Sequence, residues 1–194
     1  MKIIITGFTG SGKSTLAKKL AKEFGLEYFS GGDLLRKLIA GEGSLREKGW
    51  WESERGEEAF QKRSMNENFD RKVDEFLLNV LRDKDDVVVD SWTAAYLYGG
   101  ADAVKIYLKA DLDERARRVS LRDGITFVDA KEAIKKKDKA SKEQYRRLYG
   151  FNLGDDLTVF DLVIDTTHLN RDEVFDLVSR YLTYRFRRGS DGSD

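Results

Sequence analysis

The chain has 194 residues, with 35 basic and 35 acidic side chains, so its formal net charge at neutral pH is zero. That balance argues against a general affinity for nucleic acid or for an anionic membrane surface. The chain has no cysteine and one histidine, which excludes disulfides and metal sites built from thiolates or several imidazoles. Its length corresponds to one domain, or to one core with small inserts. We expect a cytoplasmic protein, since no apolar run is long enough to span a bilayer or form a signal-peptide core, and we expect it to act as a monomer.

Apolar runs and amphipathic stretches alternate along the chain. The β-branched run at 2–6 predicts a buried strand, and the apolar spacing at 14–24 predicts a helix. Asp33 is the expected N-cap of the second helix, and Asp111 with Glu114 forms the capping-box pattern of a later one. In chain order, we predict a strand at 2–6, a helix at 14–24, a strand at 27–29, helices at 33–40 and 69–81, strands at 87–89 and 103–108, helices at 111–121 and 130–149, a strand at 162–164 and a helix at 170–186.

This order of elements predicts an α/β fold, with a parallel sheet covered by helices on both faces. Two stretches, roughly 42–70 and 123–150, are too polar for a core, so we expect them to form helical inserts that stand over the strand ends. Residues 1–188 then make a single domain. The Gly- and Ser-rich end, 189–194, is expected to be a disordered tail or a remnant of the expression vector.

The first predicted strand runs into the sequence Gly7-Phe8-Thr9-Gly10-Ser11-Gly12-Lys13-Ser14, which fits the pattern G-x-x-x-x-G-K-[ST]. Glycines let the backbone curl so that amide N–H groups face phosphate oxygens, and the helix that begins here adds its positive end. Lys13 supplies a compact positive charge, and the Ser14 hydroxyl suits Mg²⁺. The alternative is a glycine-rich turn, but the strand before the motif and the helix after it favour phosphate binding. The residues expected to hold the phosphates of a nucleotide are Gly7, Thr9, Gly10, Ser11, Gly12, Lys13, Ser14 and Thr15.

Asp90 ends the predicted strand at 87–89. A carboxylate at the carboxyl end of a buried strand, beside a phosphate loop, suits the second protein oxygen of a magnesium site. The alternative is an aspartate that caps the following turn. Because phosphoryl transfer at such a loop needs a metal-binding partner, we predict Ser14 and Asp90 as the metal pair.

Four further blocks follow the phosphate loop, at 30–36 (SGGDLLR), 117–124 (RRVSLRDG), 145–150 (YRRLYG) and 161–166 (DLVIDT). Their order and spacing resemble the archaeal-type cytidylate kinases, which belong to the adenylate-kinase-like nucleoside monophosphate kinases. The resemblance extends from Met1 to about Leu182. It implies a P-loop fold with a helical monophosphate-binding insert at about 33–81 and a lid at about 123–150.

The resemblance also implies a reaction and a set of site residues. The reaction moves the γ-phosphoryl of ATP, with Mg²⁺, onto the phosphate of a nucleoside monophosphate. By resemblance, Arg36 holds the acceptor phosphate and Asp33 lies near the acceptor nucleoside, while Arg118 lies against the adenine of ATP and Arg122 contacts its phosphates. The planar fork of arginine suits phosphate, and Arg118 and Arg122 share one helical face. The alternative is a pair of solvated salt bridges, Asp33 with Arg36 and Glu114 with Arg118.

Two features depart from the family pattern. The family carries a Glu-Gly-Arg-like turn after its third strand, but this chain has Asp90-Ser91-Trp92, so Trp92 replaces an arginine that binds phosphate. In the lid, Lys137 and Gln144 stand where arginines are expected. Trp92 is predicted either to stack on the acceptor or to fill the core. The lid cations that could substitute from shifted positions are Lys139, Lys142 and Arg146.

The favoured hypothesis is transfer from ATP to a nucleoside monophosphate, CMP or dCMP first, giving ADP and the diphosphate. Lys13, Arg36 and Arg122 would neutralise charge, and Trp92 would contact the acceptor. The alternatives are a kinase of a different small-molecule acceptor and a nucleotide-gated ATP-binding module with little transferase activity. No partner beyond the substrates is expected.

Overall fold

The computed structural model describes residues 1–46 and 50–190, and its centre is a five-stranded parallel sheet with the strand order β2-β3-β1-β4-β5. The predicted α/β fold class is therefore confirmed, and each predicted strand is present. The strands are β1 (Lys2–Thr6), β2 (Glu27–Ser30), β3 (Val87–Asp90), β4 (Ala103–Lys109) and β5 (Leu162–Asp165).

Each helix predicted with a range is present, with shifts at its ends, whereas α5 was not predicted and α3 was expected only as part of the polar stretch 42–70. The final helix continues to Ser190, so Gly189 and Ser190 are helical rather than part of a tail, and 191–194 lie outside the described residues. The helices are α1 (Lys13–Phe24), α2 (Gly31–Ala40), α3 (Glu54–Met65), α4 (Asn68–Asp83), α5 (Ala94–Leu97), α6 (Leu112–Asp123), α7 (Phe127–Tyr149) and α8 (Arg171–Ser190), with short 3₁₀ turns η1 (Glu42–Arg46) and η2 (Trp50–Glu52).

One predicted helix cap is wrong, and the other lacks its hydrogen bonds. The N-cap of α2 is Ser30, whose side-chain oxygen accepts a hydrogen bond from the Asp33 amide at 3.2 Å. Ser30 has the extended backbone that an N-cap requires, so the helix begins at the two glycines and Asp33 falls within its first turn. At α6, Asp111 is the N-cap residue as predicted, but its side chain makes no cap hydrogen bond. Its amide donates to the Thr167 hydroxyl, and Glu114 pairs with arginines further along the same helix instead of completing the capping box.

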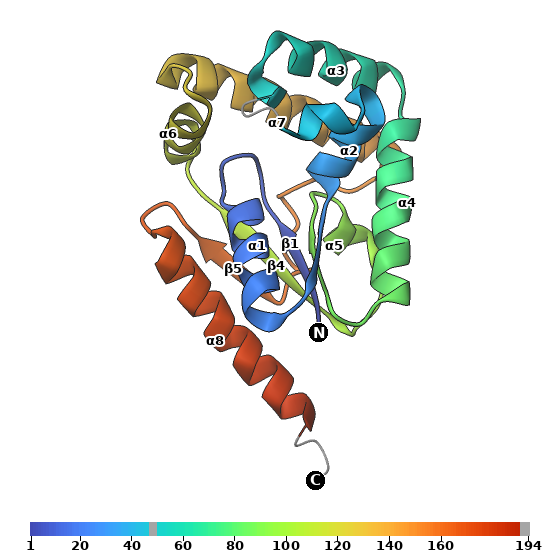
Figure 1. The fold of residues 1–194 in the computed structure, drawn as a ribbon, viewed down its shortest axis with the longest axis vertical. Helices are drawn as coiled ribbons and strands as arrows, with labels where there is room; N and C mark the ends of the chain where they lie inside the picture. The colour runs from blue at the N-terminus through green and yellow to red at the C-terminus, as the bar shows by residue number, and fades with distance from the viewer. Residues whose placement is uncertain (47–49, 191–194) are drawn as a thin grey trace.

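Helices lie on both sides of the sheet (Figure 1), and alternate residues of the central strands pack against opposite layers. Ile3 and Ile5 pack with α1 and α8, whereas Ile4 packs with α2, α4 and α5. All three isoleucines are fully buried, and burial of each side chain contributes about 1.5–3 kcal/mol. The two-sided core explains why the central strands are continuous apolar runs rather than alternating ones.

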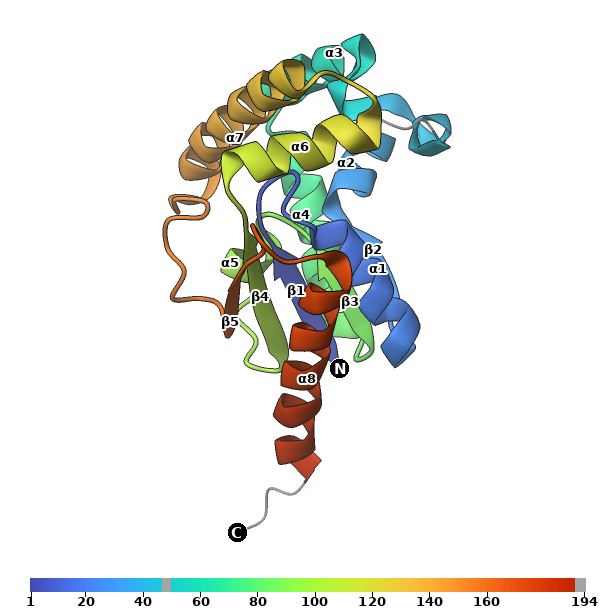
Figure 2. The same ribbon diagram turned by 90° about the vertical axis from the view of Figure 1, so that its left-hand side faces the viewer.

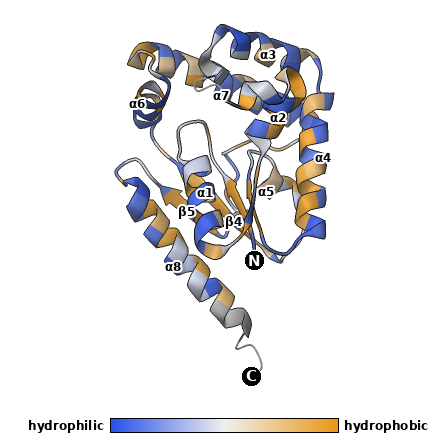
Figure 3. Ribbon diagram, viewed as in Figure 1, coloured by the Kyte–Doolittle hydropathy of each residue, from blue (hydrophilic) through white to orange (hydrophobic). Residues whose placement is uncertain are grey.

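The polar inserts lie above the carboxyl ends of the strands. Figures 1 and 2 show α3, α6 and α7 grouped at this end of the molecule, with α8 on the opposite side of the sheet layer from α4. Figure 3 shows the apolar colour gathered on the strands and along α4, whereas α3 is mostly hydrophilic. The helices α6 and α7 share a small apolar cluster of their own, formed by Ala116, Val119, Ala130 and Ile134. Within residues 1–46 and 50–190, no helix combines the length and apolar character that a bilayer-crossing segment needs.

Candidate active site

The loop between β1 and α1 is shaped by its glycines. A Cβ atom on Gly7 would lie 2.2 Å from the Leu108 carbonyl oxygen, so only glycine fits between the loop and β4. Gly12 is the N-cap of α1 and has a φ of 102°, a left-handed conformation that favours glycine. The α1 backbone begins directly after it, and the positive end of the helix therefore opens at the loop.

Lys13 lies at the centre of a group of charged side chains. The Lys13 residue is half-buried as a whole, and its ammonium donates a hydrogen bond to the Phe8 carbonyl at 3.3 Å. Burial lowers the pKa of Lys13, and Arg115 and Arg122 act in the same direction, whereas Asp90 and Asp138 oppose it. An added polyanion would stabilise this ammonium.

Ser14 and Asp90 meet beside the loop, as the sequence predicts. The Ser14 hydroxyl donates a hydrogen bond to the Asp90 carboxylate, which is 4% exposed at the end of β3. Two adjacent oxygens fit a hard cation such as Mg²⁺, which commonly takes one or two protein ligands and completes its shell with water and phosphate oxygens. Among residues 1–46 and 50–190, no group of three or more acidic, His or Cys side chains forms a separate metal site.

Arg118 and Arg122 both lie on α6 near the loop, but they are held differently. The Arg118 guanidinium donates to the Gly10 carbonyl at 3.3 Å and to the Thr166 carbonyl at 2.5 Å, and also pairs with Glu114 at 2.8 Å. Hydrogen bonds from Arg117 and Arg118 lower the pKa of Glu114 to about 2. Arg118 is therefore fixed against the loop, and the Glu114 salt bridge expected as an alternative is also present.

Arg122 remains more exposed at the end of the same helix. Its guanidinium pairs with Asp123, and its charge lowers the pKa of Lys13. The structure thus brings Arg122 and Lys13 within electrostatic reach of each other.

The two predicted acceptor-site residues on α2 differ in environment. Arg36 is 7% exposed, and its guanidinium carbon lies 4.8 Å from the centre of the Trp50 ring. Asp33 is exposed in the first turn of the same helix. The structure therefore anchors Arg36 inside the insert and leaves Asp33 on its surface.

Trp92 faces the phosphate loop. Its ring centre lies 6.0 Å from that of Phe8 and 6.3 Å from that of Tyr145, in edge-to-face contacts. The Lys13 ammonium lies 6.0 Å from the centre of the same ring. Trp92 is half-buried and is not part of the three apolar clusters of the described residues.

The phosphate loop, the Ser14–Asp90 contact and the covering helices are accompanied by a sequence match over most of the chain. The model of the cytidylate kinase-like family matches residues 2–168. The chain belongs to the cytidylate kinase-like family. It is therefore a kinase, that is, a phosphotransferase, and the family predicted from the sequence is confirmed.

Individual relatives of this kinase cover nearly its whole length. The cytidylate kinase of Sulfurisphaera tokodaii is 34% identical over 185 residues, or 95% of this chain and 96% of that protein. The cytidylate kinase of Ignicoccus hospitalis is 34% identical over 180 residues, or 93% and 98% of the two chains.

Solved structures of other kinases share the fold alone. A gluconokinase from Sinorhizobium meliloti matches with a TM-score of 0.57 at 13% identity, covering 95% of this chain and 96% of that one. A shikimate kinase from Acinetobacter baumannii, in complex with shikimate, matches with a TM-score of 0.53 at 17% identity, covering 96% and 93%.

Sequence reasoning missed the contacts through which α7 of this kinase covers the phosphate loop. Arg115 donates to the Thr9 carbonyl at 3.2 Å and pairs with Asp138 of α7 at 2.7 Å. The Lys142 ammonium lies 5.4 Å from the centre of the Phe8 ring and pairs with Asp155. The sequence did hold one signal for Arg115. It lies one turn before Arg118 on the same predicted helix, so both side chains could have been expected near the loop.

A buried polar network joins the insert to α7. Arg63 and Asp70 are each 2% exposed and form an ion pair at 2.9 Å. Three side chains of α7 complete the network: Ser141 and Tyr145 accept hydrogen bonds from Arg63, and Gln144 donates to Asp70 at 2.5 Å. Gln144, at a position where the family resemblance places an arginine, therefore binds a carboxylate in this kinase.

A second buried carboxylate lies next to this network. Asp74 is 5% exposed and accepts hydrogen bonds from the Thr93 hydroxyl and, at 2.6 Å, from the Tyr149 hydroxyl. Burial raises its pKa to about 6, although the two hydroxyls act in the opposite direction. Tyr149 thus ties the end of α7 to the core helix α4.

Two cations of α7 pair with carboxylates of the insert. Lys136 pairs with Glu57, and Arg147 pairs with Glu67 at 2.5 Å. The Lys137 ammonium lies 4.9 Å from the centre of the Trp51 ring. Lys142, one of the lid cations considered from the sequence, lies against Phe8 of the loop.

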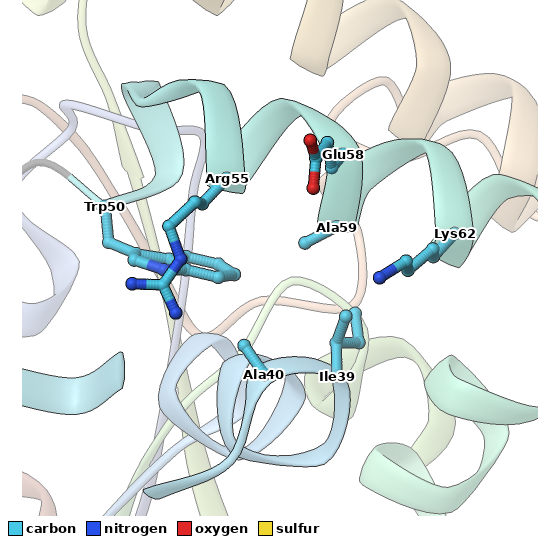
Figure 4. A pocket seen from close by; sticks show the side chains of 7 residues that line it. All are labelled: Ile39, Ala40, Trp50, Arg55, Glu58, Ala59 and Lys62. Carbon is cyan, nitrogen blue, oxygen red and sulfur yellow. The ribbon is translucent and has the colours of Figure 1, made fainter. Parts of the chain in front are cut away.

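A separate cavity of about 150 Å³ lies within the insert, between α2 and α3 (Figure 4). None of its lining residues belongs to the phosphate loop. They are Ile39, Ala40, Trp50, Arg55, Glu58, Ala59 and Lys62.

Proposed function

We propose that this kinase transfers the γ-phosphoryl group of ATP to the phosphate of a nucleoside monophosphate, with CMP or dCMP favoured, giving ADP and the nucleoside diphosphate. The observation that carries the proposal is the meeting of Lys13, the Ser14–Asp90 pair and Arg122 at the start of α1. The names of the relatives from Sulfurisphaera tokodaii and Ignicoccus hospitalis support a cytidylate acceptor.

The donor side is the better defined half of the proposed site. The loop amides from Gly7 to Thr15 would hold the phosphates of ATP, and Arg118 would lie against the adenine. Ser14 and Asp90 would hold Mg²⁺, which supplies charge neutralisation and aligns the phosphates when bound. Lys13 would bind the β- and γ-phosphates.

Transfer between two anionic groups requires cations on both sides of the moving phosphoryl group. Lys13 and Arg122 would supply charge on the donor side, and Arg36 on the acceptor side. Lys142 of α7, which lies against Phe8, would supply positive charge from the lid.

No strong general base is needed for this reaction, because the acceptor phosphate is already an anionic nucleophile. The protein therefore has to position the two substrates and exclude water, which would otherwise accept the phosphoryl group. The contacts of α7 with Phe8 of the loop and with Asp70 of the insert support this closing role. As predicted from the sequence, we expect the enzyme to act as a cytoplasmic monomer.

One observation favours a second candidate, a kinase of a different small-molecule acceptor. Trp92 lies beside Lys13, where the resemblance places an arginine for the acceptor phosphate. An aromatic ring suits the face of a base or of a sugar better than a phosphate group.

A panel assay separates the two candidates. ADP release is measured with ATP and Mg²⁺ while CMP, dCMP, UMP, AMP and a set of sugars and other hydroxyl-bearing metabolites are added in turn. The proposal predicts the largest stimulation with CMP or dCMP. Stimulation by a metabolite, with none by any monophosphate, would support the second candidate, and ATP binding without turnover on any acceptor would favour a nucleotide-gated binding module.

A further inference from the structure

Asp138 is the lid carboxylate that faces the phosphate loop. It projects from α7, and one of its oxygens accepts a hydrogen bond from Arg115 at 2.7 Å. The same guanidinium donates to the Thr9 carbonyl at 3.2 Å, so Arg115 links the lid carboxylate to the loop backbone. Arg115 is 8% exposed, which strengthens its pairing with a charged partner.

The second oxygen of Asp138 is buried and has no hydrogen-bond donor among the described residues. Burial raises the pKa of this carboxyl, while the charges of Arg115, Lys137 and Lys13 lower it. The same carboxylate raises the pKa of Lys13. Asp138 therefore acts as a counter-ion to two cations, Arg115 by contact and Lys13 at longer range.

A nucleotide triphosphate held by the loop would bring several negative charges toward the same two cations. Like charges that share a buried site raise each other's energy, so the carboxylate of Asp138 and a terminal phosphate oppose each other there. The conflict is relieved when the Asp138 side chain leaves Arg115, or when Asp138 takes up a proton.

We propose that Asp138 is a positioning residue of the donor site, a lid carboxylate that competes with the terminal phosphate of the nucleotide for Arg115 and Lys13. The inference rests on the proposed function, since it requires a triphosphate in the loop. Nucleotide binding breaks the Asp138–Arg115 pair, so that the lid position depends on whether the donor is bound. Only molecules in which the Asp138–Arg115 pair is broken can bind the nucleotide fully. When these are a fraction of all molecules, the apparent Kd exceeds the intrinsic Kd by the inverse of that fraction.

Calorimetric titration of the full chain tests this competition. The variants are Asp138→Asn, which keeps an oxygen for Arg115 but removes the charge, and Glu143→Gln, which removes the same charge from an exposed position on the same helix. We expect Asp138→Asn to bind Mg-ATP about fivefold more tightly than the unaltered chain. Glu143→Gln should stay within about twofold, and adenosine, which has no phosphate, should bind all three proteins alike.

A pH series on the unaltered chain tests the same claim without a substitution. Because burial raises the pKa of Asp138, a fall in pH below 7 favours its protonated form and should tighten binding of Mg-ATP relative to Asp138→Asn. The affinity ratio of the two proteins should therefore fall toward one at acid pH.

The outcomes separate this inference from the proposed function. If the unaltered chain binds Mg-ATP and Asp138→Asn binds it equally tightly or more weakly, the proposed competition is wrong, while the proposed function stands. An unaltered chain that binds no triphosphate would contradict both.

Discussion

The hydroxyl of Ser14 donates a hydrogen bond to the carboxylate of Asp90, although 76 residues separate them in the chain. The contact follows from the sheet: β3 pairs in parallel with β1, and Asp90 lies opposite Ile5, close to the point where β1 enters the phosphate loop. The sheet therefore positions a carboxylate beside the first turn of α1, where the proposed metal would lie.

Substitution of Asp90 tests that role. Asp90→Asn keeps the size and a hydrogen-bond acceptor for Ser14 but removes the charge that favours a divalent cation. We expect kcat to fall about 100-fold or more and the Mg²⁺ concentration needed for half-maximal rate to rise. The control is Asp172→Asn. Asp172 lies on α8, and its exposed carboxylate pairs with Lys19 of α1. A normal magnesium response in Asp90→Asn would contradict the assignment.

Trp92 gives a prediction about the acceptor. If its ring contacts the acceptor, Trp92→Ala should raise the KM for the acceptor about tenfold, whereas the KM for ATP should change less than twofold. Trp92→Phe should retain most of the affinity, because it keeps an aromatic face. Steady-state kinetics with each substrate varied in turn provide the measurement. Equal changes in both KM values would indicate that Trp92 only supports the loop through its contact with Phe8.

The sheet and the phosphate loop were predictable because their signals are local. A β-branched run such as Ile3–Ile5 has few alternatives to a buried strand, and the glycines, Lys13 and Ser14 carry their chemistry in adjacent positions. Asp90 was predictable because parallel strands end at one edge of the sheet.

The lid contacts were not predictable for the opposite reason. Arg63, Asp70 and Gln144 come from three helices, and their burial depends on how α7 packs on α3 and α4. On a polar helix, each of these side chains is equally consistent with a solvated surface. The predicted N-cap of α2 was wrong for a local reason. Ser30 and Asp33 both suit an N-cap, and only the position where β2 ends decides between them.

The buried Arg63–Asp70 pair predicts a large effect on stability. Arg63→Met leaves the carboxylate of Asp70 in the interior without its cation, which should lower the free energy of unfolding by about 3–5 kcal/mol. The double variant Arg63→Met/Asp70→Leu removes both charges and should recover part of that loss, since it leaves no unpaired buried charge, although Ser141, Gln144 and Tyr145 of α7 lose their hydrogen-bond partners. Urea denaturation measures all three proteins. A loss under about 1 kcal/mol in the single variant would show that the pair is hydrated in solution.

Asp74 predicts a pH dependence of stability. Its pKa is raised to about 6 in the folded protein, so the folded state holds the proton more tightly than the unfolded state between about pH 4 and pH 6. In that interval its contribution to the free energy of unfolding should fall as pH rises, by on the order of 2–3 kcal/mol. Asp74→Asn should lack this component, so the difference between the two stability curves isolates it. Parallel curves for the two proteins would contradict the raised pKa.

Binding of a triphosphate at the phosphate loop is the claim on which the proposed reaction depends, and calorimetric titration of Mg-ATP into the unaltered chain and into Lys13→Ala tests it most directly. We predict one Mg-ATP site in the unaltered chain and an affinity for Mg-ATP at least about 30-fold weaker in Lys13→Ala. The affinity should not change in Lys22→Ala, because the Lys22 side chain is exposed at the far end of α1. Equal affinities in the unaltered chain and in Lys13→Ala, or no heat with any triphosphate, would contradict it.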